Sequence, residues 1–113
     1  MLPKKNRILK DKEFSYLYRK GKFVSCGCIM MKYLPTTKDA PSRFGIVIST
    51  KVSKKSTIRN KIKRQIRDVL KKNFSKFSTG YDAVIMTNQN ILEKSYTEIE
   101  EALNKLFAKA KFI

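Results

Sequence analysis

Residues 57–74 read TIRNKIKRQIRDVLKKNF, and their apolar side chains return every three or four positions. This spacing places them on one face of an α-helix, because such a helix has about 3.6 residues per turn. The stripe consists of Ile58, Ile62, Ile66, Val69, Leu70 and Phe74. Nearly all the remaining positions are basic, so we expect a long amphipathic helix that covers a core on one side.

The patterns on either side predict two further helices and three or four strands. We expect helices at 11–20 and 95–110, and strands at 28–34, 44–49 and 83–86, with a weaker extended piece at 23–24. Residues 1–10 are basic and lack periodicity, which predicts an N-terminal arm. The element order therefore predicts a single α+β domain over 1–113, an αβββαβα sandwich around a central, mostly antiparallel sheet.

Charge is the dominant feature of the composition, with 26 Lys and Arg against nine Asp and Glu and a formal net charge of +17. A polyanion would relieve the resulting self-repulsion, and nucleic acid fits best. A membrane surface is the second candidate, but residues 57–74 lack an aromatic face for insertion. Because no apolar run is long enough to span a bilayer or form a signal peptide, we expect a cytoplasmic protein without a membrane partner.

The residue inventory excludes several common catalytic and metal-binding arrangements. The chain has no histidine, which excludes histidine-dependent nucleophile and acid–base mechanisms. Its two cysteines, Cys26 and Cys28, are too few for a zinc site, and we expect them to be a reduced pair within one strand. The four glycines form no phosphate-binding motif, so the sequence does not predict an autonomous active site.

The basic residues of the long helix form an ordered band that could follow a phosphate backbone for about 27 Å. They are Arg59, Lys63, Arg67 and Lys71, with Asn60 and Arg64 on the adjoining ridge. The alternative is a face that merely keeps the helix soluble. Such a face normally mixes signs, yet Asp68 is the only acid between residues 51 and 72, which favours nucleic-acid binding.

This helix resembles the signature of the bacterial ribonuclease P protein family, in which an Arg-Asn-Arg segment is followed by Ile and further basic residues. Here the segment is Arg59-Asn60-Lys61-Ile62-Lys63-Arg64, with Arg67 one turn on. The resemblance covers almost the whole chain. It includes Asn6-Arg7, Phe14 with Tyr18, Arg43-Phe44-Gly45 and Tyr81-Asp82.

The resemblance implies a left-handed βαβ crossover around the basic helix, against the usual right-handed preference. It implies a subunit that binds ribonuclease P catalytic RNA and the 5′ leader of precursor tRNA. The RNA would hydrolyse the leader with Mg²⁺ required by the RNA-containing holoenzyme. The protein alone would bind no metal or other cofactor and need no obligate protein partner.

Carried onto this sequence, the family pattern assigns an RNA-binding set, a leader-binding cleft and supporting basic contacts. The RNA-binding set is Arg59, Asn60, Lys61, Lys63, Arg64 and Arg67, the leader-binding cleft is Phe14, Tyr18 and Tyr33, and the supporting contacts are Arg7 and Lys51. Aromatic rings in such a cleft stack on unpaired bases without strict sequence preference. Core packing is the alternative role for Phe14 and Tyr18.

Two positions depart from the family pattern and put their contacts in doubt. Lys61 replaces an arginine and loses its planar fork of donors, and Thr87-Asn88 replaces a common Ala-Arg pair. Two other functions also remain open. A ribosomal or RNA-chaperone protein would have similar charge, and a DNA-binding module would place the basic helix in a major groove and prefer duplex DNA.

Overall fold

The computed structural model describes residues 11–36, 41–73 and 80–111, which form three α-helices, a short 3₁₀ helix and one four-stranded sheet. The elements run in the order α1 (Asp11–Lys20), β1 (Lys22–Cys26), β2 (Ile29–Pro35), β3 (Arg43–Val47), α2 (Ser56–Asn73), β4 (Tyr81–Thr87), η3 (Gln89–Glu93) and α3 (Tyr96–Lys109). This order confirms the predicted α+β arrangement. The expected end of the long helix at Phe74 and the basic arm at 1–10 lie outside the described residues.

The sheet has the strand order β1-β2-β4-β3 and is mostly antiparallel, as predicted. β1 pairs with β2 and β2 with β4 in antiparallel fashion, whereas β3 and β4 are parallel neighbours. Parallel neighbours need a crossover connection, and here α2 lies within it. The chain therefore leaves the sheet at the end of β3, passes through the predicted basic helix α2 and returns to the sheet at the start of β4.

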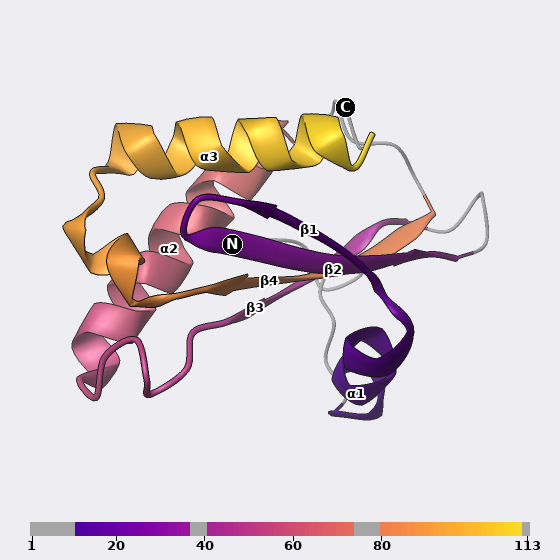
Figure 1. Ribbon diagram of the computed structural model, residues 1–113, viewed down its shortest axis with the longest axis horizontal. Helices are drawn as coiled ribbons and strands as arrows, with labels where there is room; N and C mark the ends of the chain where they lie inside the picture. The colour runs from indigo at the N-terminus through magenta and orange to yellow at the C-terminus, as the bar shows by residue number, and fades with distance from the viewer. Residues whose placement is uncertain (1–10, 37–40, 74–79, 112–113) are drawn as a thin grey trace.

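Helices cover the two faces of the sheet unequally. α2 and α3 lie on one side and α1 on the other, so part of the second side is left without a covering helix (Figure 1). Successive strand residues point to opposite faces, which separates the apolar residues into two clusters. The larger one joins Ile66 and Leu103 to Met31 and Ile85, and the smaller one is built on Leu17 and Val84.

Two glycines shape the path from α1 into the first hairpin. The amide of Gly21 donates to the carbonyl of Leu17 at 2.8 Å, and a Cβ at Gly21 would lie 2.5 Å from that oxygen. Gly27 has a φ of +59° in the two-residue turn between β1 and β2, a conformation that such hairpin turns often require. The expectation that Cys26 and Cys28 share a strand was therefore wrong. Cys26 ends β1 and Cys28 lies in the turn, and both thiols are free.

The C-terminal helix begins at a capping box that the sequence analysis did not identify. The Ser95 hydroxyl accepts from the Glu98 amide, and the Glu98 carboxylate accepts from the Ser95 amide. The new cap at Ser95 separates α3 from η3, which ends at Glu93. Ile91 of η3 is buried and belongs to the larger cluster. Among the described helices, none is long and apolar enough to cross a membrane.

Candidate nucleic-acid interface

The basic side of α2 contains a hollow, which we call the α2 hollow. Thr57, Asn60, Arg64 and Arg67 line it, and its volume is about 430 Å³. These residues are three or four positions apart, so their side chains leave the helix on one side. No acid is among the lining residues, and Asn60 and Arg64 are exposed. The α2 hollow therefore presents two guanidinium groups and an amide to any anion that enters it.

The neighbouring flank of α2 is less basic than the sequence suggests. Lys61 lies there with Arg64 and Asp68 beside Tyr96 of α3, around a second hollow of about 380 Å³. The Tyr96 hydroxyl donates to Asp68 at 2.6 Å, which keeps a carboxylate next to the predicted RNA-binding lysine. The negative charge of Asp68 repels phosphate and so weakens the attraction that Lys61 exerts on it. The Lys61 side of the band is consequently the weaker of the two.

Two other members of the predicted band have different surroundings. The Arg59 guanidinium donates through Nη1 to the Ser53 carbonyl at 2.8 Å, so it helps hold the loop that leads into α2. Lys63 is half-buried. Lys51 is exposed in the same loop, and its backbone carbonyl accepts a hydrogen bond from the Gln89 side chain at 2.7 Å. The structure thus brings Asn60, Arg64 and Arg67 together but gives Arg59 a structural bond as well.

The face of the sheet beside α1 carries a second set of candidate residues, which we call the α1 face. Phe14 is half-buried and packs against the Leu17–Val84 cluster, whereas Tyr18 is 37% exposed. The Lys32 ammonium donates to the backbone carbonyl of Tyr18 at 2.7 Å and lies 5.8 Å from the centre of the Tyr18 ring. Partial burial raises the pKa of Tyr18, so its phenol stays neutral at physiological pH.

Sequence reasoning missed two members of the α1 face. Phe23 and Lys32 are paired across β1 and β2, and the Phe23 ring is 60% exposed. Directly paired residues share a face of the sheet, so Phe23 lies on the side that carries Lys32 and Tyr18. The signal available in the sequence was a phenylalanine in the extended piece expected at 23–24. It became informative only once the register of the first hairpin was known.

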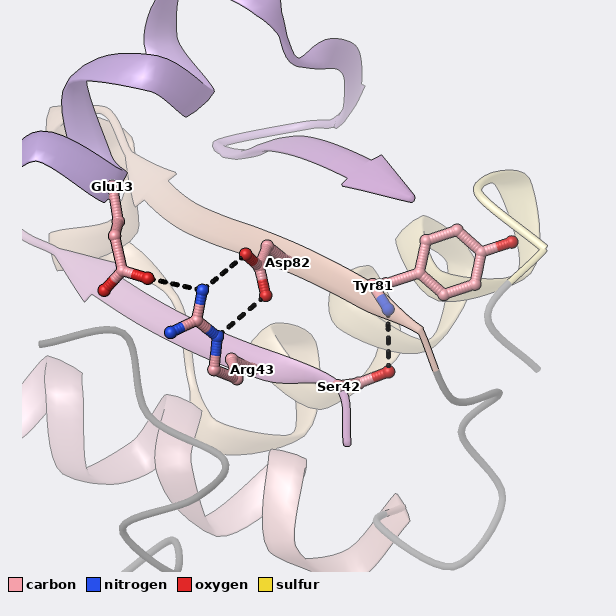
Figure 2. A network of polar contacts seen from close by, with 5 residues as sticks. All are labelled: Glu13, Ser42, Arg43, Tyr81 and Asp82. Atoms are coloured by element: carbon pink, nitrogen blue, oxygen red, sulfur yellow. Dashed lines mark hydrogen bonds and ion pairs between the residues drawn. The ribbon is translucent and has the colours of Figure 1, made fainter. Parts of the chain in front are cut away.

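A network of charged side chains fixes α1 to the sheet (Figure 2). Arg43 of β3 donates through Nε and Nη2 to the two carboxylate oxygens of Asp82 on β4, at 3.0 and 2.7 Å. The same Nη2 forms an ion pair with Glu13 of α1. Hydrogen bonding to Asp82 raises the pKa of Arg43 above its ordinary value, so the guanidinium remains charged. This tether sets the position from which α1 presents Phe14 and Tyr18.

One predicted cleft residue lies on the wrong side. Tyr33 follows Lys32 in β2, and it packs against the larger cluster on the side of α2 and α3. Its ring meets that of Tyr81, with the ring centres 6.3 Å apart. Because strand residues alternate between faces, Tyr33 cannot join Phe14 and Tyr18 on the α1 face. The assignment of Tyr33 to that cleft was therefore wrong. Arg7, another predicted contact, lies outside the described residues.

The departures from the family pattern at the end of β4 have local roles. The Asn88 side chain accepts from the Asn90 amide at 3.0 Å and caps η3. The Thr87 side chain is buried, and its hydroxyl has no hydrogen-bond partner among the residues that the structure describes. Asn88 is exposed, but its side-chain oxygen is used within the fold. Asn88 therefore favours the turn into η3, whereas the arginine common in the family pattern would supply a positive charge at this position.

The described residues contain no group of three or more acids and cysteines close enough to hold a metal ion. Cys28 is buried, and that burial raises the pKa of its thiol, which disfavours the reactive thiolate. The candidate sites on the described surface therefore offer cations, an amide and aromatic rings, which are suited to binding phosphates and unpaired bases.

Comparisons with known proteins place the chain in one family. The model of the family described as Ribonuclease P matches residues 2–111. A Ribonuclease P protein component from Rippkaea orientalis is 36% identical over 116 residues, covering 99% of this chain and 91% of the relative. One from Clostridium botulinum is 38% identical over 108 residues, covering 95% of this chain and 96% of the relative.

Solved structures show the same fold. The RNase P protein from Staphylococcus aureus superimposes with a TM-score of 0.87 at 27% identity, covering 95% of this chain and 96% of that one. The RNase P protein from Thermotoga maritima gives a TM-score of 0.77 at 26% identity, covering 88% of this chain and 94% of that one.

Proposed function

Because the chain belongs to the ribonuclease P protein family, we propose that it binds a ribonuclease P RNA through the α2 hollow and the 5′ leader of precursor tRNA on the α1 face. Membership in the family assigns it to tRNA 5′ processing as a protein component. The proposal concerns the contacts within that process, and it places the protein in the cytoplasm with the precursor.

The observation that carries the proposal is the grouping of Asn60, Arg64 and Arg67 around one hollow without an acid. Phosphate contacts supply much of the affinity for nucleic acid, and arginine can contact two phosphate oxygens at once. Asn60 adds an amide that can donate and accept at a base or a ribose. This flank fits a folded RNA backbone better than the Lys61 flank, where Asp68 opposes phosphate.

The α1 face supports leader binding through its chemistry and its position. Tyr18 and Phe23 offer rings to unpaired bases, and Lys32 lies between them as a cation. In Figure 1 the N-terminal end of α2 and the helix α1 lie at opposite ends of the view, with the uncovered part of the sheet between them. An RNA in the α2 hollow would therefore have to extend along this part of the sheet to place an unpaired segment on these rings.

We assign the chemical step to the RNA. The chain has no histidine, the Cys28 thiol has a raised pKa, and Asp82 and Glu13 are engaged with Arg43. None of these groups is set up as a base or a nucleophile for hydrolysis. In this proposal Mg²⁺ is bound by the RNA-containing holoenzyme, and the protein supplies affinity and orientation.

The test is cleavage of precursor tRNA by a bacterial ribonuclease P RNA at low Mg²⁺, with and without the protein. Cleavage should require the RNA and increase when protein is added. Arg64→Ala should weaken RNA binding and flatten its salt dependence, because one phosphate contact is lost. Lys105→Ala is the matched control, since it removes one exposed charge from α3. Equal effects of the two variants would contradict the α2 assignment.

Leader binding is tested separately by comparing precursor with mature tRNA in the presence of the RNA. Tyr18→Ala and Phe23→Ala should reduce the preference for the precursor by roughly fivefold or more, because each removes a stacking ring. Tyr16→Ala is the control, since Tyr16 is 53% exposed on α1 and lies with Pro35 and Thr36 around a hollow that neither Tyr18 nor Phe23 lines. Tighter binding of duplex DNA than of either tRNA would favour the DNA-binding alternative.

A further inference from the structure

Tyr33 and Tyr81 form part of a third hollow, at the end of the molecule where β2 finishes, β4 begins and α3 ends. The hollow has a volume of about 320 Å³, and we call it the tyrosine pocket. Both rings are half-buried and meet edge to face at an interplanar angle of 62°. Figure 2 shows the Tyr81 ring directed away from the Arg43–Asp82 ion pair, toward the last turns of a helix. The pocket therefore faces away from the α1 face.

Three lysines surround the two rings. Lys22 of β1 and Lys109 and Lys111 at the end of α3 line the same hollow, and no acid is among its lining residues. All three are exposed. Lys109 donates through Nζ to the Ser25 carbonyl at 3.1 Å, which holds its ammonium at the edge of the sheet. The pocket consequently combines aromatic surface with a fixed positive charge.

Lys111 directly follows the C-cap of α3 in a left-handed backbone conformation. Its φ is +60°, and it is the only non-glycine residue with a positive φ among the described residues. Glycine and asparagine are the residues that favour this conformation after a helix. A lysine there costs backbone energy but adds a third cation beside the tyrosines. Stabilisation of the helix end by nearby lysines is the alternative explanation, because cations are favoured at helix C-termini.

We propose that the tyrosine pocket binds an unpaired RNA nucleotide, as a second RNA contact separate from the α2 hollow and the α1 face. The base would lie against the half-buried rings, and the phosphodiester would meet the lysine ammonium groups. This combination of ring and cation is typical of sites that hold single-stranded nucleic acid without strict sequence preference. The volume lies at the lower end of the range for small-ligand pockets, about 300–1,000 Å³.

The proposal rests on the proposed function in one respect, that the bound RNA belongs to the ribonuclease P complex. Two sources share the same chemistry, namely an unpaired segment of the catalytic RNA and an unpaired segment of the precursor. Photo-crosslinking distinguishes them, with 4-thiouridine placed in one RNA at a time and the full-length protein in the assembled complex. We expect cross-links to Tyr33 or Tyr81 from one of the two RNAs.

Two variants and a control test the pocket by equilibrium binding. Lys111→Gly should make the salt dependence of log K less steep by about 0.7, because one phosphate contact to a single strand is lost. It should leave the fold intact, since glycine suits a φ of +60°. Tyr81→Leu should weaken binding roughly fivefold or more, since it removes a ring while keeping apolar volume. Lys105→Gln removes a charge from the outer side of α3 and should change neither quantity.

The outcomes separate this proposal from the one before it. Cross-links to the tyrosines, reduced by Lys111→Gly, would support the pocket whatever Arg64→Ala does. Cross-links confined to α1 and α2, with Lys111→Gly and Lys105→Gln indistinguishable, would overturn the pocket while leaving the proposed function standing. Binding of neither RNA to the wild-type protein would overturn both.

Discussion

Loss of the carboxylate in Asp82→Ala should loosen α1 from the sheet. Asp82 accepts two hydrogen bonds from the Arg43 guanidinium, at 3.0 and 2.7 Å, and the same guanidinium pairs with Glu13 of α1. Without this carboxylate nothing on β4 orients the Arg43 guanidinium, so its ion pair with Glu13 is weakened. α1 is also anchored by the buried Leu17, by Phe14 packed beside it and by the bond from Lys32 to the Tyr18 carbonyl.

The expected loss of unfolding free energy follows from burial and geometry. Hydrogen bonds to charged groups contribute about 1.5–3 kcal/mol each, and breaking a fully buried pair costs about 3–5 kcal/mol. The Asp82 side chain is 15% exposed, but that of Arg43 is 32% exposed, so water can partly replace the lost acceptor. We therefore expect a loss of about 2 kcal/mol, which for a domain of this size lowers the Tm by on the order of 10 °C.

Urea unfolding followed by circular dichroism measures the global change, and hydrogen exchange of the α1 amides measures the local one. Protection in α1 should fall more than protection in α3, because α3 packs on the other side of the sheet. Glu13→Ala is the matched comparison at the α1 end of the network. Glu13 is more exposed, at 26%, so its loss should cost at most about 1 kcal/mol, with the loss of protection confined to α1.

Two results would refute this reasoning. A loss below about 0.5 kcal/mol for Asp82→Ala would show that the bidentate bond contributes no more than an ordinary surface pair. Equal losses of protection in α1 and α3 would show that the network stabilises the whole domain and does not specifically position α1. Either result would also remove the basis for linking Arg43 to the geometry of the α1 face.

Three further predictions concern local structure. Gly21→Ala should cost about 1–3 kcal/mol in urea unfolding, since the new Cβ would lie 2.5 Å from the Leu17 carbonyl oxygen, and a wild-type midpoint would contradict that close approach. Gly27→Ala should cost about 1–2 kcal/mol because of the positive φ, with no steric part, so a larger loss would require a different cause. Ser95→Ala should destabilise the protein by about 1 kcal/mol through loss of the cap. The Glu98 carboxylate is the other half of the capping box, and the hydrogen bond from the Ser95 amide lowers its pKa. The stabilisation by the ionised carboxylate is therefore present above the ordinary pKa of a glutamate and is lost as the pH falls through the lowered value. Carbon NMR titration of Glu98 checks the direction, and an unshifted midpoint in the wild-type protein would speak against the capping box.

The local elements follow from the sequence because each is encoded by neighbouring residues. The apolar stripe predicted a helix at 57–74, and α2 spans Ser56–Asn73. The expected helices at 11–20 and 95–110 correspond to α1 and α3, and the weak extended piece at 23–24 lies within β1. Helical spacing also predicted the basic band of α2. It placed Arg67 on the ridge of Arg59 and Lys63, whereas in the structure Arg67 lines one hollow with Asn60 and Arg64.

Cross-strand relations were less accessible. The sequence suggested that Cys26 and Cys28 share a strand, but Cys26 ends β1 and Gly27 begins a turn that includes Cys28. The position of this turn sets the register of β1 against β2, and the register decides that Phe23 lies beside Lys32. A shift of one residue reverses the faces of every side chain in a strand. That is why Phe23 was missed and Tyr33 was assigned to the wrong side.

Composition and residue periodicity by themselves determined that this protein is a basic α+β domain with a helix suited to nucleic acid and without histidine-dependent chemistry. Only the tertiary structure decided the surroundings of the basic residues of α2. Asp68 and Tyr96 lie beside Lys61 on one flank of the helix, whereas no acid lines the α2 hollow on the other. It also decided which strand face α1 covers, and so separated Tyr18 from Tyr33. The physical reason is that helix periodicity is a local property, whereas the side of a sheet on which a helix packs depends on contacts between residues far apart in the chain.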